Sequence, residues 1–320
     1  MRLEWVNHAS FVIRSGGIHL MTDPWLDGTA FNRGWKLLSP TVFRYEDFAD
    51  ITHIWFSHEH PDHFSPPNLK RIPEDLRRKI TVLFHETRDK RVLKVCKAYG
   101  FAVKELAEGE VISLADDFRL VCGRQGLIDS WIAVFADGKT LLNMNDCIFT
   151  KRDDLLSIKQ KVGRVDVSLL QFSYANWVGN KGDRVSHMRH AQRKLNEIKV
   201  HLQLFQPSAF IPCASFIYFS HTENFFMNER ANRIDAVYEL ASKDMKVPTV
   251  VLYPGDMWDV GNPWDSSSSL HRYQADVERA LSCPPDTSPL VEFPRLRESA
   301  AAFVRKGNHK NNTLLLKALP

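Results

Sequence analysis

The sequence predicts an α/β protein built of layers, and two observations support this fold class. Short runs of β-branched and aromatic residues alternate with stretches of helical periodicity along all 320 residues. Strands that alternate with helices over a whole chain are typical of layered α/β folds. The composition, 44% hydrophobic and 25% charged, is that of a globular protein large enough to bury a core.

The first half of the chain is expected to be rich in short strands. Gly16 and Gly17 are typical of a hairpin turn, and they separate a strand within residues 3–14 from one over 18–22. Residues 66–99 have mainly helical character, with a clear helical spacing over 91–99. Further strands are expected over 51–56, 80–84, 118–122, 131–135 and 140–144.

The second half contains longer helices. The pattern predicts a helix over 186–205 that ends before Pro207, and another over 228–243. Strands are expected over 165–171, 210–212 and 250–253. After residue 262 we expect one helix over 273–282, a proline-rich loop and a polar end. The sequence therefore predicts one domain over residues 1–262 and a C-terminal helical extension over 263–320.

Charge and cysteine content exclude several classes of protein. The net charge of +4 is too mild to indicate nucleic-acid binding. No apolar run approaches the roughly 18 residues of a membrane span, and the N-terminus lacks a signal-peptide apolar region. The five cysteines form no CxxC pair, which favours free thiols in a reducing cytosol. We expect a cytoplasmic protein without a nucleic-acid or membrane partner, and the oligomeric state stays open.

Residues 58–63, His-Glu-His-Pro-Asp-His, follow the expected strand 51–56 and contain three imidazoles and one carboxylate. Borderline divalent metals prefer these ligands. In extended backbone His58 and His60 point the same way, so they can bind one ion together. The Pro-Asp step turns the chain, so that Asp62 and His63 can approach a second ion. With 13 histidines in the chain, a chance cluster of three is improbable.

This HxHxDH motif after an apolar strand resembles the signature of the metallo-β-lactamase superfamily. That family has an αββα sandwich with a metal site at one edge of its two sheets. Residues 7–11 and 22–26 look like the branch that contains the ascorbate-phosphate lactonases. The metallo-β-lactamase-like region of CMP-N-acetylneuraminate hydroxylase is resembled by residues 23–28 with 34–35, by 57–69, by 142–143 with 146–147, and by 206–207 with 212 and 220–221. The resemblance covers about residues 3–261, and the hydroxylase's Rieske domain is absent because no CxH…CxxH pair exists.

The resemblance implies one or two divalent ions, which could be zinc, iron or manganese. It implies a first site on His58 and His60, a second on Asp62, His63 and His221, and Asp146 as the bridge between them. The remaining histidine of the first site should lie within residues 123–130, but this stretch has no histidine.

By placement, Gln125 occupies the slot of the missing histidine, and Asp129 is the nearest carboxylate. An amide oxygen is a poorer zinc ligand than imidazole. The first site would therefore be weak, recruit Asp129 or a substrate group, or suit iron or manganese better than zinc.

Two residues of the expected site, Asp62 and His8, each have two possible roles. Asp62 is either a ligand of the second ion, which we favour, or the group that orients the nucleophile and accepts its proton. His8 either donates to the cavity close to the metals or caps a turn. Asp23 is expected to fix the loop beneath the histidines by hydrogen bonds.

Aromatic residues flank the expected ligands and are candidates for the walls of a substrate pocket, with core packing as the alternative. These candidates are Tyr174, Trp177 and Tyr218.

Three functions compete. The leading one is a metal-dependent hydrolase, in which hydroxide formed at the metal attacks an ester, thioester, lactone or phosphate ester of a small anionic molecule. The alternative is a non-haem di-iron oxygenase that uses the same ligands with an external reductase. A non-catalytic module is disfavoured, because only one expected ligand position is lost.

Overall fold

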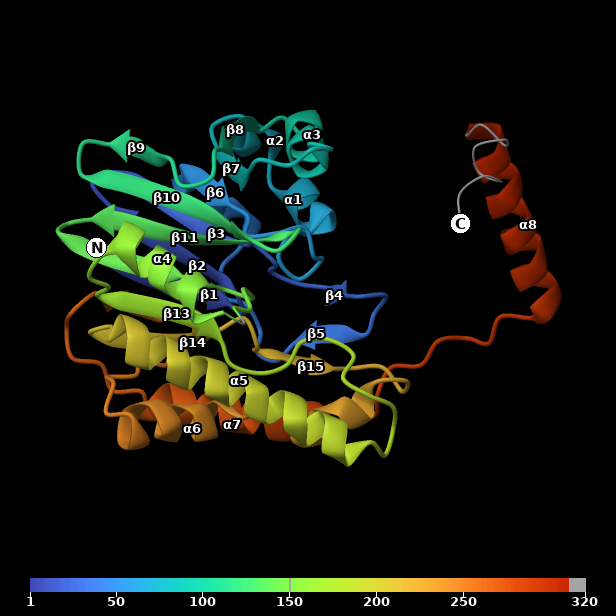
Figure 1. Ribbon diagram of the computed structural model, residues 1–320. Coiled ribbons are helices and arrows are strands. Elements are labelled where there is room, and N and C mark those ends of the chain that lie inside the picture. The colour runs from blue at the N-terminus through green and yellow to red at the C-terminus, as the bar shows by residue number, and fades with distance from the viewer. Residues whose placement is uncertain (150, 311–320) are drawn as a thin grey trace. The chain divides into compact units, whose positions relative to one another are not determined.

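The computed structural model describes residues 1–149 and 151–310 (Figure 1). The chain divides into two compact units, residues 1–285 and 286–320. This division differs from the expected boundary after residue 262, because helix α7 (Ser267–Ser282) packs within the first unit. Its Tyr273 is fully buried, and the phenol donates a hydrogen bond of 2.8 Å to the Leu252 carbonyl. Burial of this ring thus assigns α7 to the main core.

The second unit contains helix α8 (Phe293–Lys310), in a stretch that the sequence predicted as a loop and polar end. Pro294 lies in its first turn, where proline is tolerated because the missing N–H would have no helical partner. The last part of that expected polar end, residues 311–320, lies outside the described residues.

The first sheet has seven strands in the order β16-β1-β2-β3-β6-β7-β8 (Figure 1). Its strands are β1 (Arg2–Asn7), β2 (Ser10–Ser15), β3 (Ile18–Thr22), β6 (His53–Trp55), β7 (Thr81–His85), β8 (Ala102–Leu106) and β16 (Met257–Asp259). The pairs from β3 through β8 are parallel. The β2–β3 hairpin turns at Gly16 and Gly17, which both have positive φ, so this prediction is confirmed.

The second sheet has six strands in the order β14-β13-β12-β11-β10-β9. Its strands are β9 (Val111–Ala115), β10 (Phe118–Gln125), β11 (Asp129–Ala136), β12 (Lys139–Asn143), β13 (Val167–Gln171) and β14 (Ala209–Cys213). A small third sheet, in the order β15-β5-β4, joins β4 (Thr29–Ala30), β5 (Trp35–Leu37) and β15 (Ile217–Phe219).

The helices cover the outer faces of the two large sheets. Alternating side chains of β7 show why: Leu83 packs in the core that includes Ile132 of the second sheet, whereas Val82 packs with Leu93 of α3. Helices α1–α3 therefore lie on the first sheet, and α4 and α5 lie on the second (Figure 1). This helix–sheet–sheet–helix arrangement confirms the predicted αββα sandwich.

The described helices of the first unit besides α7 are mostly short. They are α1 (Pro66–Arg71), α2 (Glu74–Arg77), α3 (Arg91–Ala98), α4 (Arg152–Val162), α5 (Arg184–Phe205), α6 (Ile234–Tyr238), the 3₁₀ helices η1 (Tyr45–Asp50) and η2 (Phe225–Arg230), and the π-helical turn η3 (Glu239–Asp244). The predicted helix 186–205 is confirmed as α5. Its N-cap Asp183 accepts a hydrogen bond of 3.0 Å from the Ser186 N–H, and Gln206 ends it in the left-handed region.

Two predictions for the second half were wrong. The expected single helix 228–243 is divided among η2, α6 and η3. The expected strand 250–253 does not form, because side chains bind its backbone. Ser266 Oγ accepts the Val251 N–H at 3.0 Å, and the Asp256 carboxylate accepts the Tyr253 N–H at 2.7 Å.

Across residues 1–149 and 151–310, no helix combines the length and apolarity that a bilayer crossing requires.

Candidate metal centre

The candidate site lies where β3, β6 and β12 end, and one buried carboxylate joins the three loops. Asp23 directly follows β3, and its own N–H donates to the Trp55 carbonyl at 3.0 Å. Its carboxylate accepts the N–H and the hydroxyl of Ser57, both at 2.7 Å. It also pairs with His63 Nδ1 at 3.0 Å and accepts the Asn145 side-chain amide. As the sequence predicts, Asp23 holds the loop beneath the histidines.

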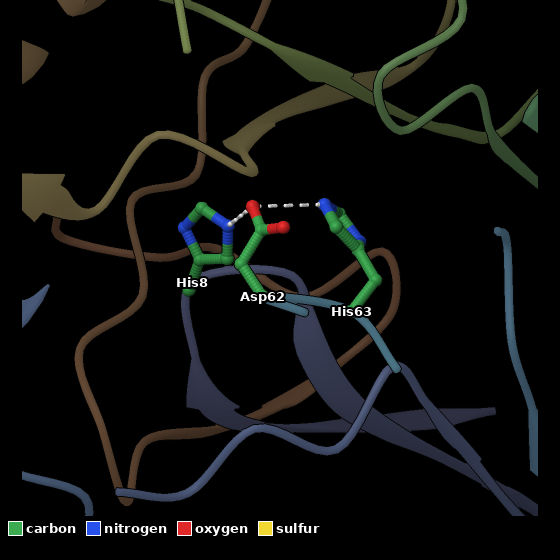
Figure 2. Close-up of side chains that lie close together, drawn as sticks. All are labelled: His8, Asp62 and His63. Atoms are coloured by element: carbon green, nitrogen blue, oxygen red, sulfur yellow. Dashed lines mark ion pairs between the residues drawn. The ribbon is translucent and has the colours of Figure 1, made fainter. Parts of the chain in front are cut away.

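Two groups of side chains could each hold a metal ion, and they share His63. One is His8, Asp62 and His63, whose ligand atoms lie within 4.8 Å of one another. Figure 2 shows both rings turned toward the carboxylate, and His8 Nε2 and His63 Nε2 each lie 3.4 Å from Asp62 Oδ2. The other group is His58, His63 and Asp146, with 3.5 Å between His63 Nε2 and Asp146 Oδ2.

His60 reaches this centre through His58. The two histidines are hydrogen-bonded, with 2.8 Å between His58 Nε2 and His60 Nδ1. Two ring nitrogens at this distance share one proton, which a metal ion between them would displace. The motif thus brings His58, His60, Asp62 and His63 into one neighbourhood, and Asp146 joins them from the β12 end.

Burial and neighbouring charges have opposite effects on the pKa values of Asp62 and His63. Burial disfavours the charged form of Asp62, but the charge of His63 and the ring nitrogens of His63 and His8, both 3.4 Å away, hold its pKa well below the usual range. Burial also disfavours protonated His63, yet Asp62, Asp146 and Asp23 raise its pKa well above the ordinary value. Without a metal, Asp62 and His63 therefore form a buried ion pair.

His58 has the opposite behaviour. Burial, with the nearby charge of His63, lowers its pKa to about 4. At neutral pH its imidazole is therefore uncharged, and a neutral imidazole offers the lone pair that a metal needs.

Several buried polar atoms of the two groups make no hydrogen bond of good geometry among the described residues, although His8 Nε2 and His63 Nε2 have ion-pair contacts of 3.4 Å with Asp62. They are both ring nitrogens of His8, Asp62 Oδ1, His63 Nε2 and Asp146 Oδ1. A buried polar atom without a partner costs about 1–3 kcal/mol. A divalent ion would satisfy these atoms together, so the donor set fits a metal.

The slot of the missing histidine lies at the β10–β11 hairpin. Gln125 donates its side-chain amide to the Ile148 carbonyl at 2.6 Å, and its role as a ligand stays a prediction. Asp129 Oδ1 lies 3.9 Å from His58 Nδ1. Burial and the charge of Asp146 raise the pKa of Asp129 to about 6. A carboxylate therefore faces the first-site histidines at this point.

His8 and His221 differ in their relation to the centre. His8 has the left-handed φ of 47° in the turn between β1 and β2, and its buried ring belongs to the group with Asp62. His221 follows β15, and its Nδ1 accepts the Glu223 N–H at 3.3 Å. His221 is in neither three-residue group of the described residues, and its place in the second site stays a prediction.

The expected substrate-pocket residues lie in different surroundings. Tyr174 is buried and donates its hydroxyl to the Met227 carbonyl. Tyr174 and Tyr218 line a cavity of about 30 Å³, which has room for water rather than for a substrate. Trp177 is 57% exposed, with its ring edge-on to Phe226 at 5.7 Å. Their role toward a substrate stays a prediction.

Two small polar residues that were not predicted from the sequence complete the Asp23 network. Ser57 precedes the motif, and its hydroxyl lies 2.9 Å from His58 Nδ1. Asn145 precedes Asp146 and has the left-handed φ of 47°. An asparagine just after a strand is a signal for such a turn and could have identified the second residue.

Comparison with known proteins agrees with this geometry. Residues 2–117 match the model of the beta-lactamase superfamily domain. The chain is 24% identical over 309 residues to the cytidine monophosphate-N-acetylneuraminic acid hydroxylase of Mus musculus, an alignment that covers 92% of this chain and 50% of the relative. Residues 2–117 thus resemble the beta-lactamase superfamily domain, and the larger part of the chain has the metallo-β-lactamase fold.

Two solved structures share this metallo-β-lactamase fold. The diiron β-hydroxylase CmlA from Streptomyces venezuelae has a TM-score of 0.58 at 16% identity, over 80% of this chain and 53% of CmlA. The isothiocyanate hydrolase from Delia radicum gut bacteria has a TM-score of 0.57 at 12% identity, over 82% of this chain and all of that chain. At these identities the likeness concerns the fold alone. The chain also spans about half or less of the length of the curated relatives that it matches.

Proposed function

We propose that this metallo-β-lactamase-fold chain is a metal-dependent hydrolase of a small anionic ester, thioester, lactone or phosphate ester. The observation that carries the proposal is the set of buried donor atoms on His8, Asp62, His63 and Asp146 that make no hydrogen bond of good geometry among the described residues. A buried cluster that is costly without a ligand is typical of a functional site rather than of a stabilising network.

Asp23 prepares His63 for its role. Its carboxylate lies 3.0 Å from His63 Nδ1, so that nitrogen carries the proton and Nε2 is left to face Asp62 and Asp146. Bound divalent ions would lower the pKa of water from about 15.7 to about 7 and polarise the scissile oxygen. Asp62 and Asp146, whose pKa values lie below the usual range, stay ionised and can compensate the positive charge of the ions.

A second candidate is hydroxylation with iron, and two specific observations favour it. The carboxylate of Asp129 lies beside His58, where the family pattern expects an imidazole, and oxygen ligands suit iron and manganese better than they suit zinc. Relatives and one structural neighbour are named as hydroxylases. This reaction would need an external reductase.

Metal analysis separates the two candidates. The chain is purified without chelator, its metals are measured by mass spectrometry, and turnover of p-nitrophenyl acetate and p-nitrophenyl phosphate is assayed. Zinc or manganese with ester turnover supports the hydrolase. Iron with reductant-dependent oxygen uptake supports the hydroxylase and contradicts the hydrolase.

The matched variants are His63→Ala and His53→Gln. His53 is the first residue of β6, the strand before the cluster 58–63. Its Nδ1 contacts Thr52 Oγ1 at 2.9 Å. We expect His63→Ala to lose bound metal and His53→Gln to retain it. Metal retained equally by both variants would contradict a centre built around His63.

A further inference from the structure

Helix α8 carries an apolar stripe whose large side chains are all exposed. Apolar residues recur on one side of the helix at the spacing of its turns. The exposed fractions are 73% for Phe293, 51% for Leu296, 78% for Phe303 and 56% for Val304. Ala300 lies between them on the same face, and Figure 1 shows α8 as one uninterrupted helix. Such a stripe on an otherwise polar helix points to an apolar surface that it contacts.

Outside the apolar stripe, the surface of α8 is basic. Five cationic side chains stand against the single carboxylate of Glu298, and they are Arg295, Arg297, Arg305, Lys306 and Lys310. The excess of four positive charges equals the net charge of the whole chain, +4. The rest of the chain is therefore balanced, and its basic character resides in this one helix.

The charges also flank the stripe. At 100° per residue, Arg297 lies at one border of the apolar arc, next to Val304, and Lys310 lies at the other, next to Phe303. Long cationic side chains at both borders can contact charges on a flat surface while the apolar stripe between them is buried in that surface. A second copy of α8 would bring two such basic helices together, and like charges disfavour that pairing.

We propose that α8 is an interfacial helix that binds the surface of an anionic lipid bilayer. Its apolar face would enter the headgroup boundary and its cations would contact acidic headgroups. With six charged residues in 18, the helix would lie in the plane of the surface and not cross it. The proposal is independent of the metal centre, and it changes the expectation that the chain has no membrane partner.

Co-sedimentation of the full chain with vesicles tests this proposal. One set of vesicles is phosphatidylcholine alone, and the other contains phosphatidylserine as well. We expect binding only to the second set, weakening with salt. The double variant Leu296→Ser, Phe303→Ser should weaken binding at least about tenfold, since it removes two large apolar side chains from the face that would be buried. Arg305→Gln should weaken it about fivefold.

The matched control is Ala301→Ser with Ala302→Ser, which changes two small residues outside the stripe and should bind like the original chain. Circular dichroism of each variant reports whether helix content is retained. The proposal is overturned if the original chain ignores phosphatidylserine vesicles, or if the stripe variant binds as well as the control. It is also overturned if the stripe variant converts a stable dimer to a monomer, because the stripe then covers a second copy.

Discussion

Replacing Asp23 with asparagine tests how the metal centre is held in place. Asp23 is fully buried, and its two oxygens have different partners. Oδ1 accepts the Ser57 N–H at 2.7 Å, and an amide oxygen could keep this bond. Oδ2 accepts the Ser57 hydroxyl at 2.7 Å, pairs with His63 Nδ1 at 3.0 Å and accepts the Asn145 amide. In Asp23→Asn an NH₂ group would face these three donors.

The magnitude follows from these contacts. A hydrogen bond to a charged group contributes about 1.5–3 kcal/mol, and removing one partner of a buried charge pair costs about 3–5 kcal/mol. Because the Ser57 hydroxyl can rotate to donate elsewhere, we expect Asp23→Asn to lose about 4 kcal/mol of unfolding free energy. Metal affinity should fall about 10- to 100-fold, since His63 loses the partner that orients its ring.

Two measurements check this prediction. Urea unfolding in the presence of chelator gives the stability change without metal, and competition with a chromophoric chelator gives the affinity. The control is Asp27→Asn, four residues later, where Asp27 pairs with Arg71 at 2.6 Å and both side chains are about half exposed. Such a surface pair contributes about 0–1 kcal/mol. If Asp23→Asn behaves like Asp27→Asn in both assays, Asp23 does not organise the centre.

Three further predictions concern other titratable side chains. Burial lowers the pKa of His201 to about 3, so the unfolded chain binds the proton first as pH falls, and stability declines below about pH 6.5. Between pH 7 and pH 5 the original chain should lose about 2 kcal/mol more than His201→Gln in urea unfolding, and parallel losses would refute this. Lys194 is 3% exposed in the buried stripe of α5 and pairs with Glu197 at 3.2 Å. Because Arg193 also contacts Glu197, at 3.3 Å, Lys194→Met should be neutral or stabilising by about 1 kcal/mol in thermal unfolding, and a loss above about 2 kcal/mol would contradict it. Asp129→Ala should lower the metal count per chain in mass spectrometry, whereas an unchanged count would show that Asp129 is no ligand.

Elements with local signals could be predicted from the sequence. The β2–β3 hairpin follows from two glycines in a turn, and α5 follows from its periodicity and the proline after it. The third sheet has no such signal, because its strands have only two or three residues and β5 pairs with β15 from a distant part of the chain. Similarly, the strand expected over 250–253 failed because Ser266 and Asp256 compete for its backbone. Non-local hydrogen bonds cannot be read from local propensity.

The sequence by itself determined the donor types of the candidate centre, because residues 58–63 supply three imidazoles and one carboxylate directly after one strand. Only the tertiary structure decided which atoms meet. Packing of the two sheets brings Asp146 to 3.5 Å from His63, and the left-handed turn at His8, not the spacing of the motif, directs a further imidazole to Asp62. Contacts between distant segments depend on how strands pair and pack. A motif therefore specifies the donor types, while the fold selects their partners.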